Sequence, residues 1–334
     1  MNYSEYPPRT AADIVRIRRR LQRAGVPPKV TDKNIIIATW NIRMFGDVYP
    51  SFEENPHYPK RNLRAIAIIA EIISHFDVVA IQEVRRDVTG LRTLLEFLGP
   101  HWGVILSDVN EGHAGNAERL AFVYDKRRVD PSGLAGELVL PPEWGTRALQ
   151  QFARTPYAVS FRAGDIAFIL VTVHIRYGSG NPNERLPELE AFAEWMARWS
   201  RREDRYHEDL IVLGDFNIDR RGDPRFEAFT SRGLNVPPQI RGISTNLATG
   251  KKAKHYDQIG WFMGQLHMEF TGRAGSVDFA GAVFKELSLR NMSYRVSDHL
   301  PLWVEFSTDR SNEQLIHVLQ LDELAPDPLA QVPD

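Results

Sequence analysis

The segment LIVLGDFNID, residues 210–219, decides the fold, because it joins a buried strand to a group of polar side chains. Residues 210–213 are apolar and lead into Gly214, after which Asp215 and Asn217 follow. A short apolar run that ends at glycine is typical of a strand buried on both faces. The segment therefore predicts a strand whose end presents two oxygen-bearing side chains.

The same arrangement recurs, since one strand-like run after another ends in a side chain that can bind a hard cation or move a proton. The runs are NIIIATWNI (34–42), DVVAIQEV (77–84), HWGVILSD (101–108), RLAFVYD (119–125), IAFILVTVHI (166–175), LIVLGDFN (210–217), KHYDQIGWFM (254–263) and LPLWVEF (300–306). The polar residues at or beside their ends are Asn41, Glu83, His174, Asp215, Asn217, Asp257, Asp298 and His299. A single aspartate after a strand is usually a turn former, and a single histidine is usually structural. The repetition favours a shared site instead.

The order of these elements predicts sheets covered by helices in one domain. Apolar residues at helical spacing predict one helix over Ile66–Ile73 and another over Leu189–Trp199. The expected loops, rich in Gly, Pro, Asn and charge, are 47–61, 110–117, 141–150 and 176–187. Long loops at strand ends are where binding sites are usually built.

Composition is that of an ordinary folded protein, with 334 residues, 43% hydrophobic and 25% charged. The chain has no cysteine, so disulfides, thiolate zinc sites and cysteine nucleophiles are excluded. Any metal must bind oxygen and imidazole ligands. The N-terminus lacks an apolar signal region and no run of about 18 apolar residues occurs. We therefore expect a cytoplasmic protein without a membrane span.

Charge divides the chain into three parts. Residues 1–30 hold seven Arg or Lys against two acids, a net of +5, and residues 307–334 hold one Arg against six acids, a net of −5. Since the whole chain is at −2, the body, 31–306, is close to neutral and offers no global argument for nucleic acid. We expect a basic arm, a folded body and an acidic tail. Ile14 and Ile17 share a helical face, which favours an arm packed on the body over a phosphate-seeking helix.

The polar set at the strand ends suits metal-assisted phosphoester hydrolysis. Carboxylate and amide oxygens are ligands of Mg²⁺, Mn²⁺ and Ca²⁺, and Mg²⁺ accepts one or two carboxylates together with water and substrate phosphate. Histidines supply a base for the attacking water and an acid for the departing oxygen near neutral pH. The expected cofactor is Mg²⁺, with Mn²⁺ or Ca²⁺ as alternatives.

A set of segments together resembles the endonuclease/exonuclease/phosphatase superfamily and, within it, deoxyribonuclease I most. They are NIRMFG, VVAIQEVRRD, ERLAFVYD, VTVH, LIVLGDFN, YDQI and VSDHLP, in the family's order, between about residues 35 and 306. The resemblance implies an α+β fold, a four-layer αββα sandwich of two packed mixed β-sheets flanked by helices, with the site at one end. The resemblance also implies that residues 31–306 form the catalytic domain.

The resemblance also implies a role for the acidic and amide strand ends. Glu83 would be the principal metal ligand, with Asn41 and Asp298 beside it. Asp215 and Asn217 would hold the scissile phosphate, a second metal or the attacking water. The opening segment would thus present its oxygen and amide groups to a phosphorus atom.

Two histidines would complete the reaction. By resemblance, His299 would pair with Asp257, and His174 would pair with a nearby carboxylate. The two imidazoles would then serve as acid and base on opposite sides of the phosphate. Which of them is the acid is left open.

The expected substrate contacts are Arg85, Asn116 and Arg119. In deoxyribonuclease I an Arg after QEV and a Tyr two residues before the ER pair reach into the DNA minor groove. Arg85 keeps the first position, and the second falls on Asn116 in GNAERL. Arginine in a narrow minor groove supports a DNA substrate, whereas the missing ring removes a stacking surface. A further departure is an insertion after Asn41, GDVYPSFEENPHYPKRN (46–62).

The leading hypothesis is a metal-dependent endonuclease that hydrolyses the DNA backbone by in-line attack of water. A second hypothesis keeps this chemistry and changes the substrate to a nucleotide, RNA, lipid or inositol phosphate. The chain lacks the PAWCDR-like segment of inositol phosphatases, and Gln258 stands where abasic-site endonucleases usually have Arg. A third hypothesis is a catalytically silent binding protein, which would usually lack one of the acid, amide or histidine positions, and all are filled. The oligomeric state is left open.

Overall fold

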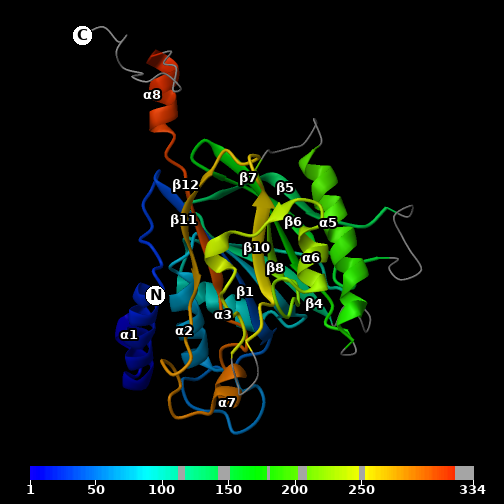
Figure 1. The fold of residues 1–334 in the computed structure, drawn as a ribbon. Coiled ribbons are helices and arrows are strands. Elements are labelled where there is room, and N and C mark those ends of the chain that lie inside the picture. The colour runs from blue at the N-terminus through cyan, green and yellow to red at the C-terminus, as the bar shows by residue number, and fades with distance from the viewer. Residues whose placement is uncertain (112–116, 142–150, 179–180, 202–208, 248–252, 320–334) are drawn as a thin grey trace.

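The structure, a computed structural model, describes residues 1–111, 117–141, 151–178, 181–201, 209–247 and 253–319. Within them, two six-stranded sheets pack face to face, with helices on both outer faces (Figure 1). The first sheet has the order β11 (Glu269–Ser276), β12 (Leu302–Ser307), β1 (Asn34–Phe45), β2 (Val78–Arg85), β4 (Glu118–Asp125) and β3 (Trp102–Leu106). The second has the order β5 (Asp130–Glu137), β6 (Tyr157–Ala163), β7 (Ile166–His174), β8 (Asp209–Asp215), β10 (Asp257–Phe262) and β9 (Leu234–Asn235).

Each sheet contains one parallel pair, and these pairs position the site. β1 runs parallel to β2, and β7 runs parallel to β8, whereas their other neighbours are antiparallel. A parallel pair needs a crossover connection, which α2 (Leu63–Ile73) supplies in the first sheet and α5 (Leu186–Ser200) in the second. The carboxyl ends of β1 and β2 therefore meet at one edge, as do those of β7 and β8.

Side chains of β1 alternate between two cores. Ile35 and Ile37 belong to the core between the sheets, whereas Ile36, Ala38 and Trp40 belong to the core under the helices. All of them are at most 1% exposed. Because both faces of β1 are covered, its polar side chains are concentrated where the strand ends.

The helices form the two outer layers, so the predicted fold class is confirmed. α1 (Pro8–Arg23), α2 and α3 (Thr89–Leu98) cover the first sheet, and α5 and α6 (Pro224–Thr230) cover the second (Figure 1). The remaining elements are η1 (Tyr3–Glu5), η3 (Pro182–Arg185), η4 (Pro238–Ile240), α7 (Leu289–Ser293) and α8 (Ser311–Leu319). No helix in the described ranges is both long enough and apolar enough to cross a membrane.

Strands β5, β6, β9 and β11 are absent from the predicted runs. β5 (DPSGLAGE) and β11 (EFTGRAGS) lie at the edges of their sheets and are largely exposed or half-buried. β9, also at an edge, has only two residues, and β6 (YAVSFRA) interrupts its apolar run with Ser and Arg. An edge strand needs fewer apolar side chains, so its sequence signal is weaker.

Helix α1 lies against α2 with its apolar face buried. Ile14, Ile17 and Leu21 are at most 3% exposed and belong to the core under the helices. The basic side of α1 also contacts α2, where Arg18 Nε lies 2.6 Å from Glu71 Oε1. Removing residues 1–30 would therefore expose apolar surface as well as remove charge.

Glu71 of α2 is a buried carboxylate held by several donors. Tyr3 Oη donates to Glu71 Oε2 at 2.9 Å, and Arg18 Nε donates to Oε1. Burial raises the pKa of Glu71, but hydrogen bonds from His75, Arg18 and Tyr3 outweigh it and lower the pKa to about 2. A lowered carboxyl pKa contributes stability that is present above the unfolded-state value and is lost as the pH falls toward about 2.

We expect Glu71→Gln to lower the free energy of unfolding at pH 7 by about 1–3 kcal/mol, because a buried charged hydrogen-bond acceptor is lost. The difference from the wild type should shrink between pH ~4.3 and pH ~2, where the wild-type carboxylate takes up its proton. Urea denaturation at several pH values measures this. Glu111→Gln is the control, since the Glu111 side chain is 70% exposed in its pair with Arg86. If the variant loses the same free energy of unfolding at every pH, then the changed shape of the side chain, and not its lost charge, accounts for the destabilisation.

Candidate active site

Three side chains of the second sheet lie side by side where β7 and β8 end, because the strand register aligns them. β7 pairs His174 with Asp215 at the end of β8, and β10 pairs Asp257 with the same Asp215. The three residues are 6%, 1% and 0% exposed, respectively. Strand ends that are far apart in the sequence are thus placed side by side.

The GDFN turn holds Asp215 against the end of β7. Gly214 has a φ of +144°, and a Cβ there would lie 2.3 Å from the carbonyl oxygen of Val173, so only glycine allows this approach. Asn217 is also left-handed, with a φ of +51°. Its Nδ2 donates to the carbonyl of Ile175 at 2.6 Å, and its backbone N–H donates to Asp215 Oδ1 at 2.9 Å.

The first sheet contributes Asn41 of β1 and Glu83 of β2. Asn41 Nδ2 donates to Glu83 Oε1 at 3.0 Å, and the backbone N–H of Met44 donates to Glu83 Oε2 at 2.9 Å. Glu83 and Met44 have positive φ angles of +63° and +46°. Burial raises the pKa of Glu83, but the charge of the nearby His174 and these hydrogen bonds lower it to about 2. The carboxylate is therefore ionised at neutral pH.

Polar contacts cross from one sheet to the other beneath and within the site. Asn41 Nδ2 also donates to Asp215 Oδ2 at 2.9 Å, and Asn41 is 0% exposed. Gln82, the residue before Glu83, donates from Nε2 to Thr172 Oγ1 at 2.9 Å and to Thr39 Oγ1 at 3.1 Å. These contacts join β1 and β2 to β7 and β8.

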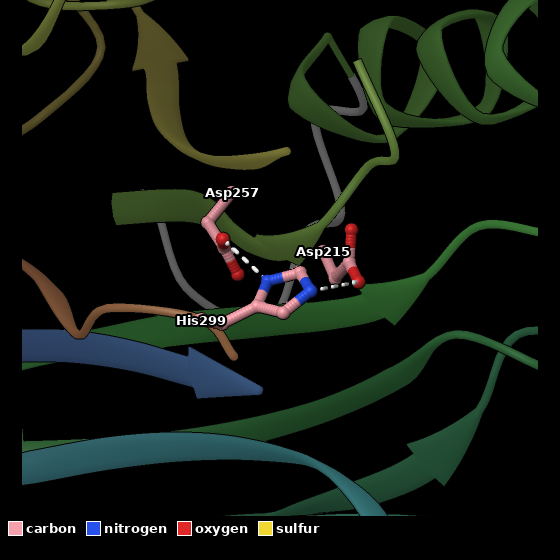
Figure 2. A group of neighbouring side chains, drawn as sticks. All are labelled: Asp215, Asp257 and His299. Carbon is pink, nitrogen blue, oxygen red and sulfur yellow. Dashed lines mark hydrogen bonds and ion pairs between the residues drawn. The ribbon is translucent and has the colours of Figure 1, made fainter. Parts of the chain in front are cut away.

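The imidazole of His299 lies between two carboxylates, as Figure 2 shows. Its Nδ1 is 2.9 Å from Asp257 Oδ2, and its Nε2 is 3.8 Å from Asp215 Oδ2. Burial lowers the pKa of His299, but Asp257 and Asp215 outweigh it and raise the pKa to about 10. Burial raises the pKa of Asp257, and His299 opposes that change. The ring of Tyr256 stacks on the imidazole with 5.5 Å between ring centroids.

The partner of His174 is Glu118, the first residue of β4. His174 Nδ1 lies 2.9 Å from Glu118 Oε2, and its Nε2 lies 3.5 Å from Asp215 Oδ2. Arg154 Nε lies 2.8 Å from the same oxygen of Glu118, which is 1% exposed. Sequence reasoning missed both Glu118 and Arg154. The sequence feature that could have identified Glu118 is its position in the ER pair, at the start of a predicted strand.

Backbone contacts fix the segment that precedes β12. Ser297 Oγ donates to the carbonyl of Asn41 at 2.6 Å and accepts from the backbone N–H of His299 at 3.0 Å. Trp40 Nε1 donates to the carbonyl of His299 at 2.9 Å. The serine of VSDHLP thus ties His299 to β1, a role that sequence reasoning also missed.

A buried arginine joins the same segment to the loop after β1. Arg61 is 4% exposed, and its guanidinium donates to the carbonyls of Arg43, Met44, Arg295 and Val296 at 2.7–3.1 Å. Burial lowers the pKa of Arg61 to about 10. This single side chain holds Met44, whose N–H contacts Glu83, next to the segment that leads to His299.

The expected substrate contacts have different environments. Arg85 has a side chain that is 23% exposed, with Nη1 3.6 Å from Glu118 Oε1, so it lies beside the His174 pair. Arg119 donates from Nη1 to the carbonyls of Arg85 and Arg86 at 3.2 and 3.1 Å. Asn116 lies outside the described residues.

Several of the predicted ligands could hold a metal. Ligand atoms of Asp215, Asp257 and His299 lie within 4.8 Å of one another. Within this group, however, Nδ1 of His299 is already bonded to Asp257 at 2.9 Å. Asp298, the residue before His299, is not one of this group; its side chain is 41% exposed, and its Oδ2 lies 3.4 Å from Arg43 Nη1.

This combination of sandwich and site is that of a phosphoesterase. Residues 38–299 match the Endonuclease/Exonuclease/phosphatase family, and the chain belongs to this family. It is 23% identical to Deoxyribonuclease-1-like 2 of Mus musculus, over 81% of this chain and 91% of that protein. The predicted membership and the likeness to deoxyribonuclease I are confirmed.

Solved structures have the same fold. One is the mannosyl-6-phosphatase Bt3783 of Bacteroides thetaiotaomicron VPI-5482, with a TM-score of 0.52 and 18% identity, over 81% of this chain and 99% of that chain. Another is ANGEL2, a 2′,3′-cyclic phosphatase, with a TM-score of 0.56 and 14% identity, over 83% of this chain and 96% of that chain. At these identities the likeness concerns the fold.

We expect Gly214→Ala to destabilise the protein by more than about 4 kcal/mol, because the new Cβ must push β8 away from Val173. Gly222→Ala is a matched control, since Gly222 also has a positive φ, +78°, with nothing within 4 Å of the new Cβ. That variant should lose only about 1–2 kcal/mol, the cost of a left-handed residue with a side chain. Urea denaturation of both variants measures the difference, and equal losses would contradict the proposed contact.

Proposed function

We propose that this protein is a metal-dependent endonuclease that hydrolyses the DNA backbone by in-line attack of water. The observation that supports this best is that Asp215 lies between two imidazoles, with Oδ2 3.5 Å from His174 Nε2 and 3.8 Å from His299 Nε2. Each imidazole has its own carboxylate, Glu118 or Asp257, 2.9 Å from Nδ1. A phosphodiester bound here has both a proton donor and a proton acceptor within reach, as hydrolysis requires.

Two further observations favour DNA as the substrate. The relative named Deoxyribonuclease-1-like 2 aligns over 81% of the chain. Arg85 lies beside the Glu118–His174 pair and remains partly exposed, which supports a contact between its guanidinium and a nucleic acid strand bound at the imidazoles. Arginine inserted into a narrow minor groove is attracted by its negative potential.

The metal is proposed to bind at Asn41 and Glu83, with Asp298 completing the ligand set. Oδ1 of Asn41 is a buried acceptor without a hydrogen-bond partner among the described residues, and amide and carboxylate oxygens are the donors that Mg²⁺ prefers. When bound, the ion polarises the phosphate and lowers the pKa of a bound water. Mn²⁺ or Ca²⁺ would fit the same donors.

Asp215 and Asn217 are proposed to hold the phosphate or the attacking water. They are 1% and 5% exposed and are fixed by backbone contacts at the ends of β7 and β8. Polar groups that are positioned in advance need no reorganisation when charge develops on the phosphate. We assign the proton transfers to His174 and His299 jointly.

We expect the protein to nick supercoiled plasmid and to hydrolyse bis-p-nitrophenyl phosphate with Mg²⁺ or Mn²⁺, but not in EDTA. Glu83→Gln should abolish both activities and weaken Mn²⁺ binding by about tenfold or more in calorimetry, because a ligand is lost. Asp257→Asn should slow hydrolysis but leave Mn²⁺ affinity nearly unchanged. If instead Asp257→Asn weakens Mn²⁺ binding and Glu83→Gln does not, the ion binds at Asp215, Asp257 and His299. If the protein hydrolyses RNA or phosphomonoesters but does not nick plasmid, then DNA is not the substrate, whereas the proposed metal-dependent hydrolysis would still stand.

We expect His174→Ala and His299→Ala each to lower kcat on DNA by about 10²–10⁴-fold, with a small change in KM. In bis-p-nitrophenyl phosphate the leaving group needs no proton. The variant without the acid should therefore retain most activity on this substrate, whereas the variant without the base should lose activity on both. His101→Ala, at an exposed position, is the control. A loss confined to KM would instead make both histidines substrate-positioning residues.

A further inference from the structure

A cavity of about 570 Å³ lies next to the proposed metal ligands. It is formed between the inserted loop after β1 and the segment around α7, and its lining includes Arg43, Tyr58, Lys60, Arg61, Tyr294 and Arg295. Met44, whose N–H contacts Glu83, also lines it, and Arg43 lies 3.4 Å from Asp298. The volume falls in the range of small-molecule sites, which is roughly 300–1,000 Å³.

The charge of the cavity favours an anion. Four of its lining residues are Arg or Lys, against the acids Asp47 and Glu54. Arg295 is 6% exposed, and its buried Nη1 has no hydrogen-bond partner among the described residues. A buried donor left without a partner costs free energy, which a bound anion would recover. Glu54 and Glu286 are the acidic groups whose charges act on Arg295.

Aromatic rings lie beside these cations. The Arg43 guanidinium stacks on the ring of Tyr294 at 4.0 Å from its centroid. Tyr294 is 38% exposed and Tyr58 is 69% exposed. An exposed ring beside a cationic pocket is the combination on which nucleotide bases stack while their phosphates bind.

We propose that this cavity binds a second phosphate of the substrate strand, next to the phosphate that is hydrolysed. Arg295 is its principal contact, and Tyr58 supports the sugar or base that joins the two phosphates. The proposal rests on the proposed nuclease function, because it assigns one phosphate to Asp215 and the imidazoles. It makes the inserted loop a determinant of specificity that favours substrates with adjacent phosphates.

Calorimetry in EDTA, where no hydrolysis occurs, tests this with thymidine 3′,5′-bisphosphate and thymidine 5′-monophosphate. The wild type should bind the bisphosphate about tenfold or more tightly than the monophosphate, as expected for a hydrogen-bonded charge pair. Arg295→Gln should remove this preference. Arg290→Gln should keep it, because Arg290 is exposed on α7 and does not line the cavity.

Tyr58→Ala provides a second measurement that does not depend on tolerance of a buried substitution. It should weaken bisphosphate binding several-fold, and circular dichroism should show an unchanged fold. The proposal is overturned if the wild type binds both nucleotides equally, if folded Arg295→Gln keeps the preference, or if Tyr58→Ala binds like the wild type. Failure of the nuclease function is a separate result, since it is an absence of plasmid nicking with Mg²⁺ or Mn²⁺.

Discussion

The hydrogen bond from Asn41 to Asp215 is the contact on which the arrangement of the site depends. It joins β1 of one sheet to the end of β8 in the other over 2.9 Å, and both residues are buried. The central strands are covered on both faces, so polar side chains are accommodated mainly at strand ends. Buried polar groups require partners, and here the partner lies in the opposite sheet. The position of the Asp215 carboxylate therefore depends on how the two sheets pack against each other.

The two imidazole pairs follow from the same geometry, because each joins one sheet to the other. Glu118 begins β4 of the first sheet and pairs with His174 of β7, whereas His299 precedes β12 and pairs with Asp257 of β10. A shift of one sheet against the other would break both pairs. The core is close-packed and resists displacement, so it fixes the relative positions of these paired side chains.

Much of this arrangement is visible in the sequence, because a buried strand is an apolar run and a site residue interrupts it. That signal marks Asp215 and His174 at their strand ends, and it predicts the central strands other than β6, but not the edge strands β5, β9 and β11. It does not reveal side chains whose importance comes from a partner far along the chain. Glu118 opens a strand of ordinary appearance, and Arg61 lies in a loop, where no periodic pattern marks its burial. Their positions follow only from the packing of distant segments.

The left-handed residues at the site have a consequence for engineering. Met44, Glu83 and Asn217 have φ angles of +46°, +63° and +51°. Each strained residue costs on the order of 1–3 kcal/mol, which the rest of the sandwich must offset. A screen for heat resistance would therefore tend to replace Met44 with glycine, which relaxes the turn that directs its N–H toward Glu83. If these residues act as proposed, we expect stability and catalytic activity to be opposed at these positions. To raise stability without losing activity, substitutions should be made in the outer helices, away from the strand ends.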